Sequence, residues 1–151
     1  MIYITTFFDT PHFRCRLFVV ALSDMKKFLL ILLGFVGVTS VSCGAMMMIE
    51  PSGSLLLLDL HWLKPTSFKN YAIPGFLLSL VGAANLYAWY TVKAEKPASM
   101  WWAVAAGVLM MGYEVVQMIL LQTTYWLQYS YIIIGFFIVL MGLQMKHKEL
   151  I

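Results

Sequence analysis

Four apolar runs constrain the fold of this chain more than any other feature of its sequence. They occupy residues 27–49, 71–92, 100–121 and 126–145, which together account for most of the chain. An α-helix of about 20 apolar residues crosses the hydrocarbon core of a bilayer, which is about 30 Å thick. The runs therefore predict an all-α integral membrane protein, a four-helix up-down bundle whose connections reverse the chain at each membrane surface.

The composition supports this fold class and leaves no room for a second domain. Of 151 residues, 62% are hydrophobic and 11% are charged, whereas a soluble domain of this size carries about a quarter charged residues. Outside the apolar runs, the chain from residue 25 onwards consists of connecting loops and a short tail. Residues 25–151 are therefore predicted to form one transmembrane domain.

The first 24 residues differ from the rest, because "TPHFRCRLFVVALSD" mixes charges into a short apolar stretch. We predict a cytoplasmic N-terminal segment over residues 1–24, or a true start at Met25, where "MKKFLLILLGFVG" has the form of a bacterial start. A lipoprotein signal ending before Cys43 is a further alternative. The length of the apolar run and the serine at position 40, where leucine is usual, favour an uncleaved helix.

The basic residues indicate orientation rather than nucleic-acid binding, because they flank the apolar runs instead of forming one patch. On one side of the predicted bundle are Arg14, Arg16, Lys26, Lys27, Lys93, Lys96, Lys146 and Lys148. The first loop contains only Lys64 and Lys69. The positive-inside rule then places both termini in the cytoplasm, the first loop outside, and the protein in the cytoplasmic (inner) membrane.

The first loop, "EPSGSLLLLDLHWLKPTSFKNYAIPG", is predicted to contain a short element at the membrane surface. Its leucines are too apolar for free solution but too few to span. Asp59, His61 and Trp62 are the candidate functional residues of this loop. A metal site built from Glu50, Asp59 and His61 has little support, since it offers a single histidine. Neither a metal nor a cofactor is expected, and the sequence has no phosphate-binding glycine loop.

Small residues recur at helical spacing within the last three runs. They are Gly75, Ser79 and Ala83 in the second, Ala103 and Gly107 in the third, and Gly135 and Gly142 in the fourth. Small side chains let helix backbones approach closely in lipid. We interpret them as internal packing positions of the bundle in preference to an oligomer interface.

Glu114 is the most informative polar residue, because it lies inside the third apolar run, in "MMGYEVVQMILLQ". A charged group near the bilayer centre costs about 2.5 to 3.5 kcal/mol even on lenient scales. We therefore expect Glu114 to face the interior of the bundle. A polar cluster is predicted around it from Gln117, Asn85, Tyr113 and Gln128.

Two interpretations of this cluster remain open. In the first, Glu114 is protonated and its hydrogen bonds hold helices together. In the second, it titrates or contacts a ligand in a pocket. The first is favoured because the predicted cluster has only one ionisable group, whereas a proton relay needs a chain of them.

The stretches "EPSG", "LKPTSFKNYAIPG", "GYEVVQ" and "YWLQYSYIIIG" together resemble a group of small four-helix bacterial membrane proteins. The resemblance covers residues 25 to about 145 and leaves residues 1–24 outside. It implies the four-helix fold and brings no activity with it.

The sequence favours a non-enzymatic role over an enzymatic one, because it has no catalytic set of Ser, Cys and His residues. We expect an accessory or assembly partner of a membrane complex, or a protein that binds an apolar ligand between its helices. The alternative is an oligomeric carrier or channel, for a small solute or coupled to protons, that uses Glu114. The expected partners are the lipid bilayer and either another membrane protein or further copies of the chain, and no nucleic acid.

Overall fold

The computed structural model describes residues 11–122 and 125–149, with side chains over 23–122 and 125–147. The elements are α1 (Pro11–Ile49), the short 3₁₀ helices η1 (Ser54–Leu56) and η2 (Leu60–Leu63), α2 (Ala72–Lys93), α3 (Ser99–Leu121) and α4 (Trp126–Glu149). No strand occurs among the described residues. The prediction of an all-α protein with four long helices is confirmed.

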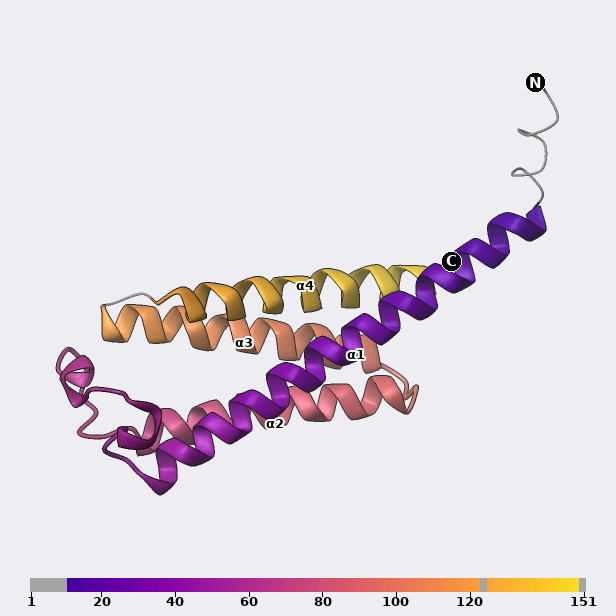
Figure 1. The fold of residues 1–151 in the computed structure, drawn as a ribbon. Helices are drawn as coiled ribbons and strands as arrows, with labels where there is room; N and C mark the ends of the chain where they lie inside the picture. Colours follow the sequence, from indigo (N-terminus) through magenta and orange to yellow (C-terminus); the bar gives the residue numbers. More distant parts are fainter. Residues whose placement is uncertain (1–10, 123–124, 150–151) are drawn as a thin grey trace.

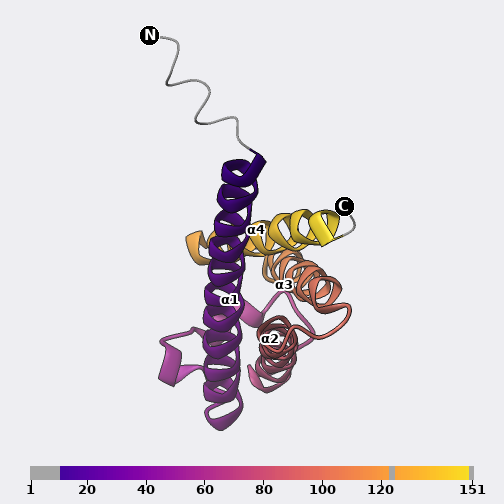
Figure 2. The ribbon, with the colours of Figure 1, turned by 90° about the vertical axis from the view of Figure 1, so that its right-hand side faces the viewer.

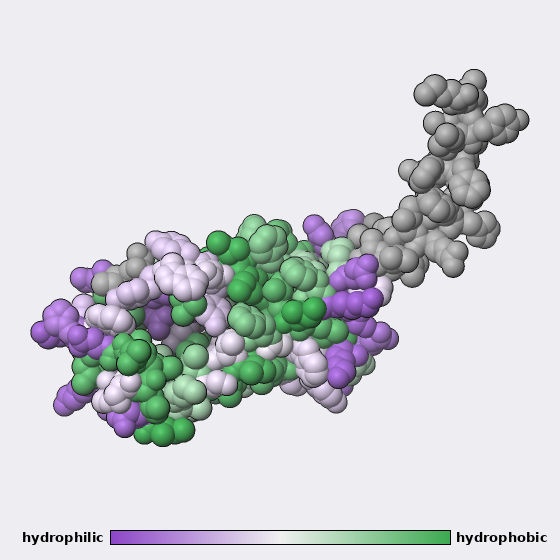
Figure 3. Space-filling view, viewed as in Figure 1, coloured by the Kyte–Doolittle hydropathy of each residue, from purple (hydrophilic) through white to green (hydrophobic). Residues whose placement is uncertain are grey.

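All four helices are long and apolar enough to cross a membrane. The candidate spans are Ser23–Ile49, Ala72–Lys93, Ser99–Leu121 and Trp126–His147. Figure 3 shows a green belt of hydrophobic residues with purple, hydrophilic residues gathered at both ends of the molecule. The chain is therefore a multi-pass membrane protein by the length and composition of its helices.

Helix α1 begins at Pro11, well before the apolar run that predicted it. Proline in the first turn costs little, because its missing N–H would have no partner there, and no glycine or further proline follows until Gly34. The helix is thus continuous through residues 11–24. Residues 1–10 of the predicted N-terminal segment lie outside the described residues.

The helices pack mainly as two neighbouring pairs, α1 with α2 and α3 with α4, and α2 joins the pairs through its contact with α3. Contact between α1 and α4 is much less extensive. Figures 1 and 2 show α1 lying obliquely across the other helices. We call the end with the 50–71 loop the loop end, and the end with the α2–α3 turn the closed end.

Glycines bring α1 and α2 into backbone contact. A Cβ atom added to Gly44 would lie 2.4 Å from the carbonyl oxygen of Gly75, and one added to Gly82 would lie 2.9 Å from that of Gly37. The prediction of internal packing positions in α2 is right for Gly75 and Ser79 but wrong for Ala83, which is exposed. Gly82 takes its place, because seven residues complete two turns of 3.6 more nearly than eight do.

A second close seam joins α3 to α4. A Cβ on Gly107 would lie 2.9 Å from the carbonyl oxygen of Gly135, and one on Gly142 would lie 2.8 Å from a methyl group of Val104. Ala103 is completely buried on the same side of α3. The interpretation of these small residues as internal packing positions is confirmed.

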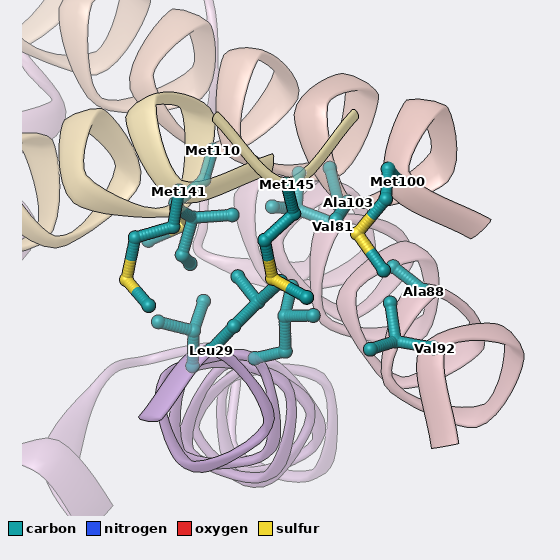
Figure 4. Packing of buried hydrophobic residues seen from close by; sticks show 13 residues of the cluster. Leu29, Val81, Ala88, Val92, Met100, Ala103, Met110, Met141 and Met145 are labelled. Atoms are coloured by element: carbon teal, nitrogen blue, oxygen red, sulfur yellow. The ribbon is translucent and has the colours of Figure 1, made fainter. Parts of the chain in front are cut away.

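The hydrophobic core fills the closed end. Figure 4 shows Leu29 of α1 and Met141 and Met145 of α4 pointing into the same space. Val92 of α2 and Met100 of α3 belong to the same buried cluster. Here side chains from all four helices meet, so α1 and α4 are bridged by packing.

The loop between α1 and α2 folds back over the loop end. Gly53 has a φ of 82°, a left-handed conformation that glycine adopts without strain. Tyr71 ties the loop together, since its backbone N–H donates to the carbonyl of Pro51 (3.0 Å) and its hydroxyl donates to the carbonyl of Asp59 (2.7 Å). The element predicted at the membrane surface is thus the pair of short helices η1 and η2.

Candidate ligand-binding cavity

A cavity of about 400 Å³ lies at the loop end, between α1, α3 and α4 and beneath the loop. Figure 3 shows the molecule hollowed at this end. Its apolar lining residues are Met47, Leu56, Leu57, Leu58, Leu78, Met110, Leu121 and Leu127. Polar and aromatic residues complete the wall, and they are described below.

The cavity exists because α1 and α4 diverge toward the loop end. Each is held by a glycine seam to a different partner, α1 to α2 and α4 to α3. Side chains on the inner face of α1 also become smaller in this direction, from Leu33 and Val36 to Ser40 and Gly44. One hydrogen bond bridges the two helices here, from the hydroxyl of Tyr131 to Oγ1 of Thr39 (3.1 Å).

Glu114 lines the cavity from α3 and is only 4% exposed. Met110 and Gln117, one turn before and after it, line the cavity too, so this face of α3 forms one wall. No hydrogen bond or ion pair joins the Glu114 carboxyl to any residue in the described part of the chain. Its expected position facing the interior is confirmed, whereas the hydrogen bonds expected to hold helices together are absent among these residues.

Gln117, Gln128 and Tyr113 join Glu114 around the cavity, as the sequence predicted. Nε2 of Gln128 donates to Oε1 of Gln117 (3.3 Å), linking α4 to α3. Oε1 of Gln128 accepts from the backbone N–H of Tyr125 (3.0 Å). The hydroxyl of Tyr113 donates to the carbonyl of Pro74 in α2 (3.2 Å).

Asn85 does not belong to this cluster, and the prediction that grouped it with Glu114 is wrong. It is buried but absent from the cavity wall, and its Nδ2 donates to the carbonyl of Val81 in its own helix (2.9 Å). At 1.5 Å per residue, Asn85 lies about 20 Å from the loop end of α2, whereas Glu114 lies about 10 Å from that of α3. The two residues are therefore at different depths.

Ser40 is a cavity residue that the sequence analysis missed. It is 2% exposed, lines the cavity from α1, and its Oγ has no hydrogen-bond partner among the described residues. Thr39 and Cys43 line the same wall. The available signal was the run "TSVSC", whose small polar side chains stand where the rest of the inner face of α1 is apolar.

The three candidate residues of the first loop, Asp59, His61 and Trp62, lie in different surroundings. Trp62 lines the cavity and packs on Tyr125, with ring centroids 5.0 Å apart. The carboxylate of Asp59 accepts from the backbone N–H of His61 (2.8 Å) and so caps η2. Asp59 and His61 do not line the cavity, and His61 is exposed. Over residues 23–122 and 125–147, whose side chains the structure describes, no three His, Cys, Asp or Glu residues come together as a metal site would require.

The cavity wall has features that small-molecule sites share. A half-enclosed apolar space carries a few polar groups, and two of them, the Glu114 carboxyl and the Ser40 hydroxyl, are buried with no partner among the described residues. Buried polar groups are normally hydrogen-bonded. A bound molecule that reaches either group would satisfy it.

Comparison with known proteins adds no relative to this picture. No family model, curated protein or solved structure matches the chain.

Proposed function

We propose that this chain is a small, non-enzymatic integral membrane protein that binds an apolar ligand between its helices. The observation that supports the proposal is the cavity of about 400 Å³ at the loop end. Ligand sites in proteins typically enclose about 300 to 1,000 Å³ and have mostly apolar walls with a few placed polar groups. The cavity has this size and this kind of wall.

The proposed setting is an up-down bundle in the cytoplasmic (inner) membrane with both termini in the cytoplasm. The basic residues support this orientation, because Lys26, Lys27, Lys93 and Lys96 gather at the closed end. Lys26 pairs there with Glu95 of the α2–α3 turn. In this orientation the cavity opens near the outer surface of the membrane.

An oligomeric carrier or channel is the second candidate function. The observation that favours it is Glu114, a carboxyl without a partner at the cavity wall, which is the kind of group that binds and releases a proton or a solute. An accessory subunit of a membrane complex is compatible with ligand binding and differs by requiring a fixed protein partner.

Native mass spectrometry of the gently extracted protein tests these functions together. The wild type is compared with Cys43→Phe, which places a ring in the cavity, and with Val38→Phe, which places the same ring on the exposed face of α1. We expect a bound small molecule in the wild type and in Val38→Phe, and none in Cys43→Phe. Thermal unfolding confirms that each variant is folded.

The spectra also separate the alternatives. A ligand retained by Cys43→Phe, or absent from every folded form, would overturn the proposed site. A symmetric oligomer would favour the carrier. A constant second protein without any small molecule would favour the accessory subunit.

A further inference from the structure

We infer that the ligand of this cavity is a lipophilic organic cation, a molecule with one positive charge on an amine or quaternary nitrogen and an apolar body. The inference rests on the proposed function and names the chemical class of its ligand. Three features of the cavity wall carry it: its charge, its aromatic rings and its opening.

The wall contains one acidic side chain and no basic one among its described residues. Glu114 is present, and no Lys, Arg or His is among the lining residues that the structure describes. A buried carboxylate without a partner is costly in a low-dielectric site. A ligand cation would supply the missing opposite charge, whereas an anionic ligand would meet a carboxylate and find no base to pair with.

Aromatic residues surround the same space. The wall includes Trp62, Tyr71, Tyr113, Tyr125, Trp126 and Tyr131. Aromatic faces attract cations, and aromatic cages are the usual means of recognising quaternary ammonium groups. An aromatic wall with a single carboxylate is thus suited to an organic cation.

The hydroxyls of three of the four tyrosines in the wall argue against a ligand recognised mainly by hydrogen bonds. Those of Tyr71, Tyr113 and Tyr131 already donate to the carbonyls of Asp59 and Pro74 and to Oγ1 of Thr39. Their donor protons are therefore taken. What these residues contribute to a ligand is chiefly the apolar and π surface of their rings.

The opening of the cavity suits a molecule that dissolves in lipid. The cavity lies where α1 and α4 diverge, and the faces of the two helices beside it carry exposed apolar residues, such as Val38 and Leu127. A cavity between two spanning helices near the membrane surface is within reach of a molecule dissolved in the bilayer. A lipophilic cation concentrated in the membrane would enter sideways, with its apolar body among the leucines and methionines of the wall.

The test uses probes of similar shape and different charge: tetraphenylphosphonium, tetraphenylborate and neutral triphenylphosphine. Their equilibrium binding is measured to the full-length protein in lipid nanodiscs, with binding to empty nanodiscs subtracted. The variants are Glu114→Gln and, as a matched control, Glu95→Gln, which makes the same change at the exposed turn of the closed end. Thermal unfolding confirms that both variants are folded.

We expect saturable binding of tetraphenylphosphonium at one site per chain, weakened at least tenfold by Glu114→Gln and unchanged by Glu95→Gln. Tetraphenylborate should show no saturable binding. Equal affinity for the cation and the borate, or undiminished binding of the cation by Glu114→Gln, would overturn the cation inference and leave the proposed function standing. Absence of saturable binding of all three probes, the neutral one included, would count against both the cation inference and the proposed function.

Discussion

The two ends of this molecule are built from the same four helices and yet differ in the space between them. At the closed end Leu29, Met100, Met141 and Met145 fill the centre, and α1 reaches α4 through packed side chains. At the loop end the corresponding space is a cavity with Glu114 in its wall. The difference teaches that close packing at one end of the helices does not require it at the other, because α1 and α4 diverge and the inner face of α1 changes from Leu33 and Val36 to Ser40 and Gly44.

The largest expected effect comes from Gly44→Ala, at the α1–α2 seam beside the cavity. The new Cβ would lie 2.4 Å from a backbone oxygen of α2, so the helices must separate. We expect a loss of more than about 3 kcal/mol of unfolding free energy, at or above the usual range for overpacking. Unfolding in mild detergent measures it.

The control for this change is Gly112→Ala, because a Cβ at Gly112 meets nothing within 4 Å. Alanine in a helix is favoured over glycine by about 1 kcal/mol, so this variant should be as stable as the wild type or slightly more stable. Equal unfolding free energies for Gly44→Ala and Gly112→Ala would show that close contact at the α1–α2 seam does not stabilise the fold.

Leu33→Ala tests the closed end, where Leu33 is completely buried. We expect a loss of about 2 to 3 kcal/mol, because the substitution leaves a void in a packed core. Leu57→Ala in the loop should cost less than about 0.5 kcal/mol, since Leu57 is 90% exposed. If the two variants have the same unfolding midpoint, the closed end is not more tightly packed than the loop.

Ser40→Ala tests the loop end, and we expect it to stabilise the protein, whereas Gly44→Ala and Leu33→Ala destabilise it. Removing a buried hydroxyl that has no partner should raise the unfolding free energy by about 0.5 to 1 kcal/mol, because its desolvation cost disappears. If the Ser40 hydroxyl instead bonds to a protein group, the substitution should lower the unfolding free energy. Chemical denaturation of the ligand-free protein distinguishes the two results.

The smallest expected effect concerns the pair of Lys26 and Glu95 at the closed end. The hydrogen bond and the charge of Lys26 hold the pKa of Glu95 below its ordinary value. A lowered folded-state pKa means that the stabilisation is present above the ordinary pKa of glutamate and is lost as the pH falls through the folded value. The melting temperature of Glu95→Gln should therefore lie slightly below that of the wild type at pH 7, and the difference should disappear as the pH falls through the lowered pKa of Glu95.

The helices across the four apolar runs were predictable because their causes are local, whereas the start of α1 at Pro11 was not predicted. Runs of about 20 apolar residues and the turn residues Pro51 and Gly53 define their positions with little reference to the rest of the chain. The inward position of Glu114 was predictable for a related reason, since the cost of exposing a carboxyl to lipid leaves few alternatives. The positions of Gln117 and Tyr113 near Glu114 were predictable too, because both residues are its neighbours on the same helix.

The cavity itself was not predictable, because it depends on how far α1 and α4 diverge. That divergence results from two glycine seams and from the small size of Ser40, which matter only once the helix pairs are known. Asn85 was grouped wrongly for a similar reason. Its depth relative to Glu114 depends on how α2 and α3 are offset along their axes, which hydropathy does not encode.

The glycine seams also have a mechanical consequence. Where Gly44 and Gly75 face each other, a Cβ added to either residue would meet the backbone carbonyl oxygen of the other, so this contact has little room to change. Since α1 packs mainly on α2 and α4 mainly on α3, we expect relative motion of the helices to occur between these two pairs rather than within them. Such a motion changes the volume of the cavity and strains the single hydrogen bond between Tyr131 and Thr39. A ligand that fills the cavity should therefore also change the angle between the two helix pairs.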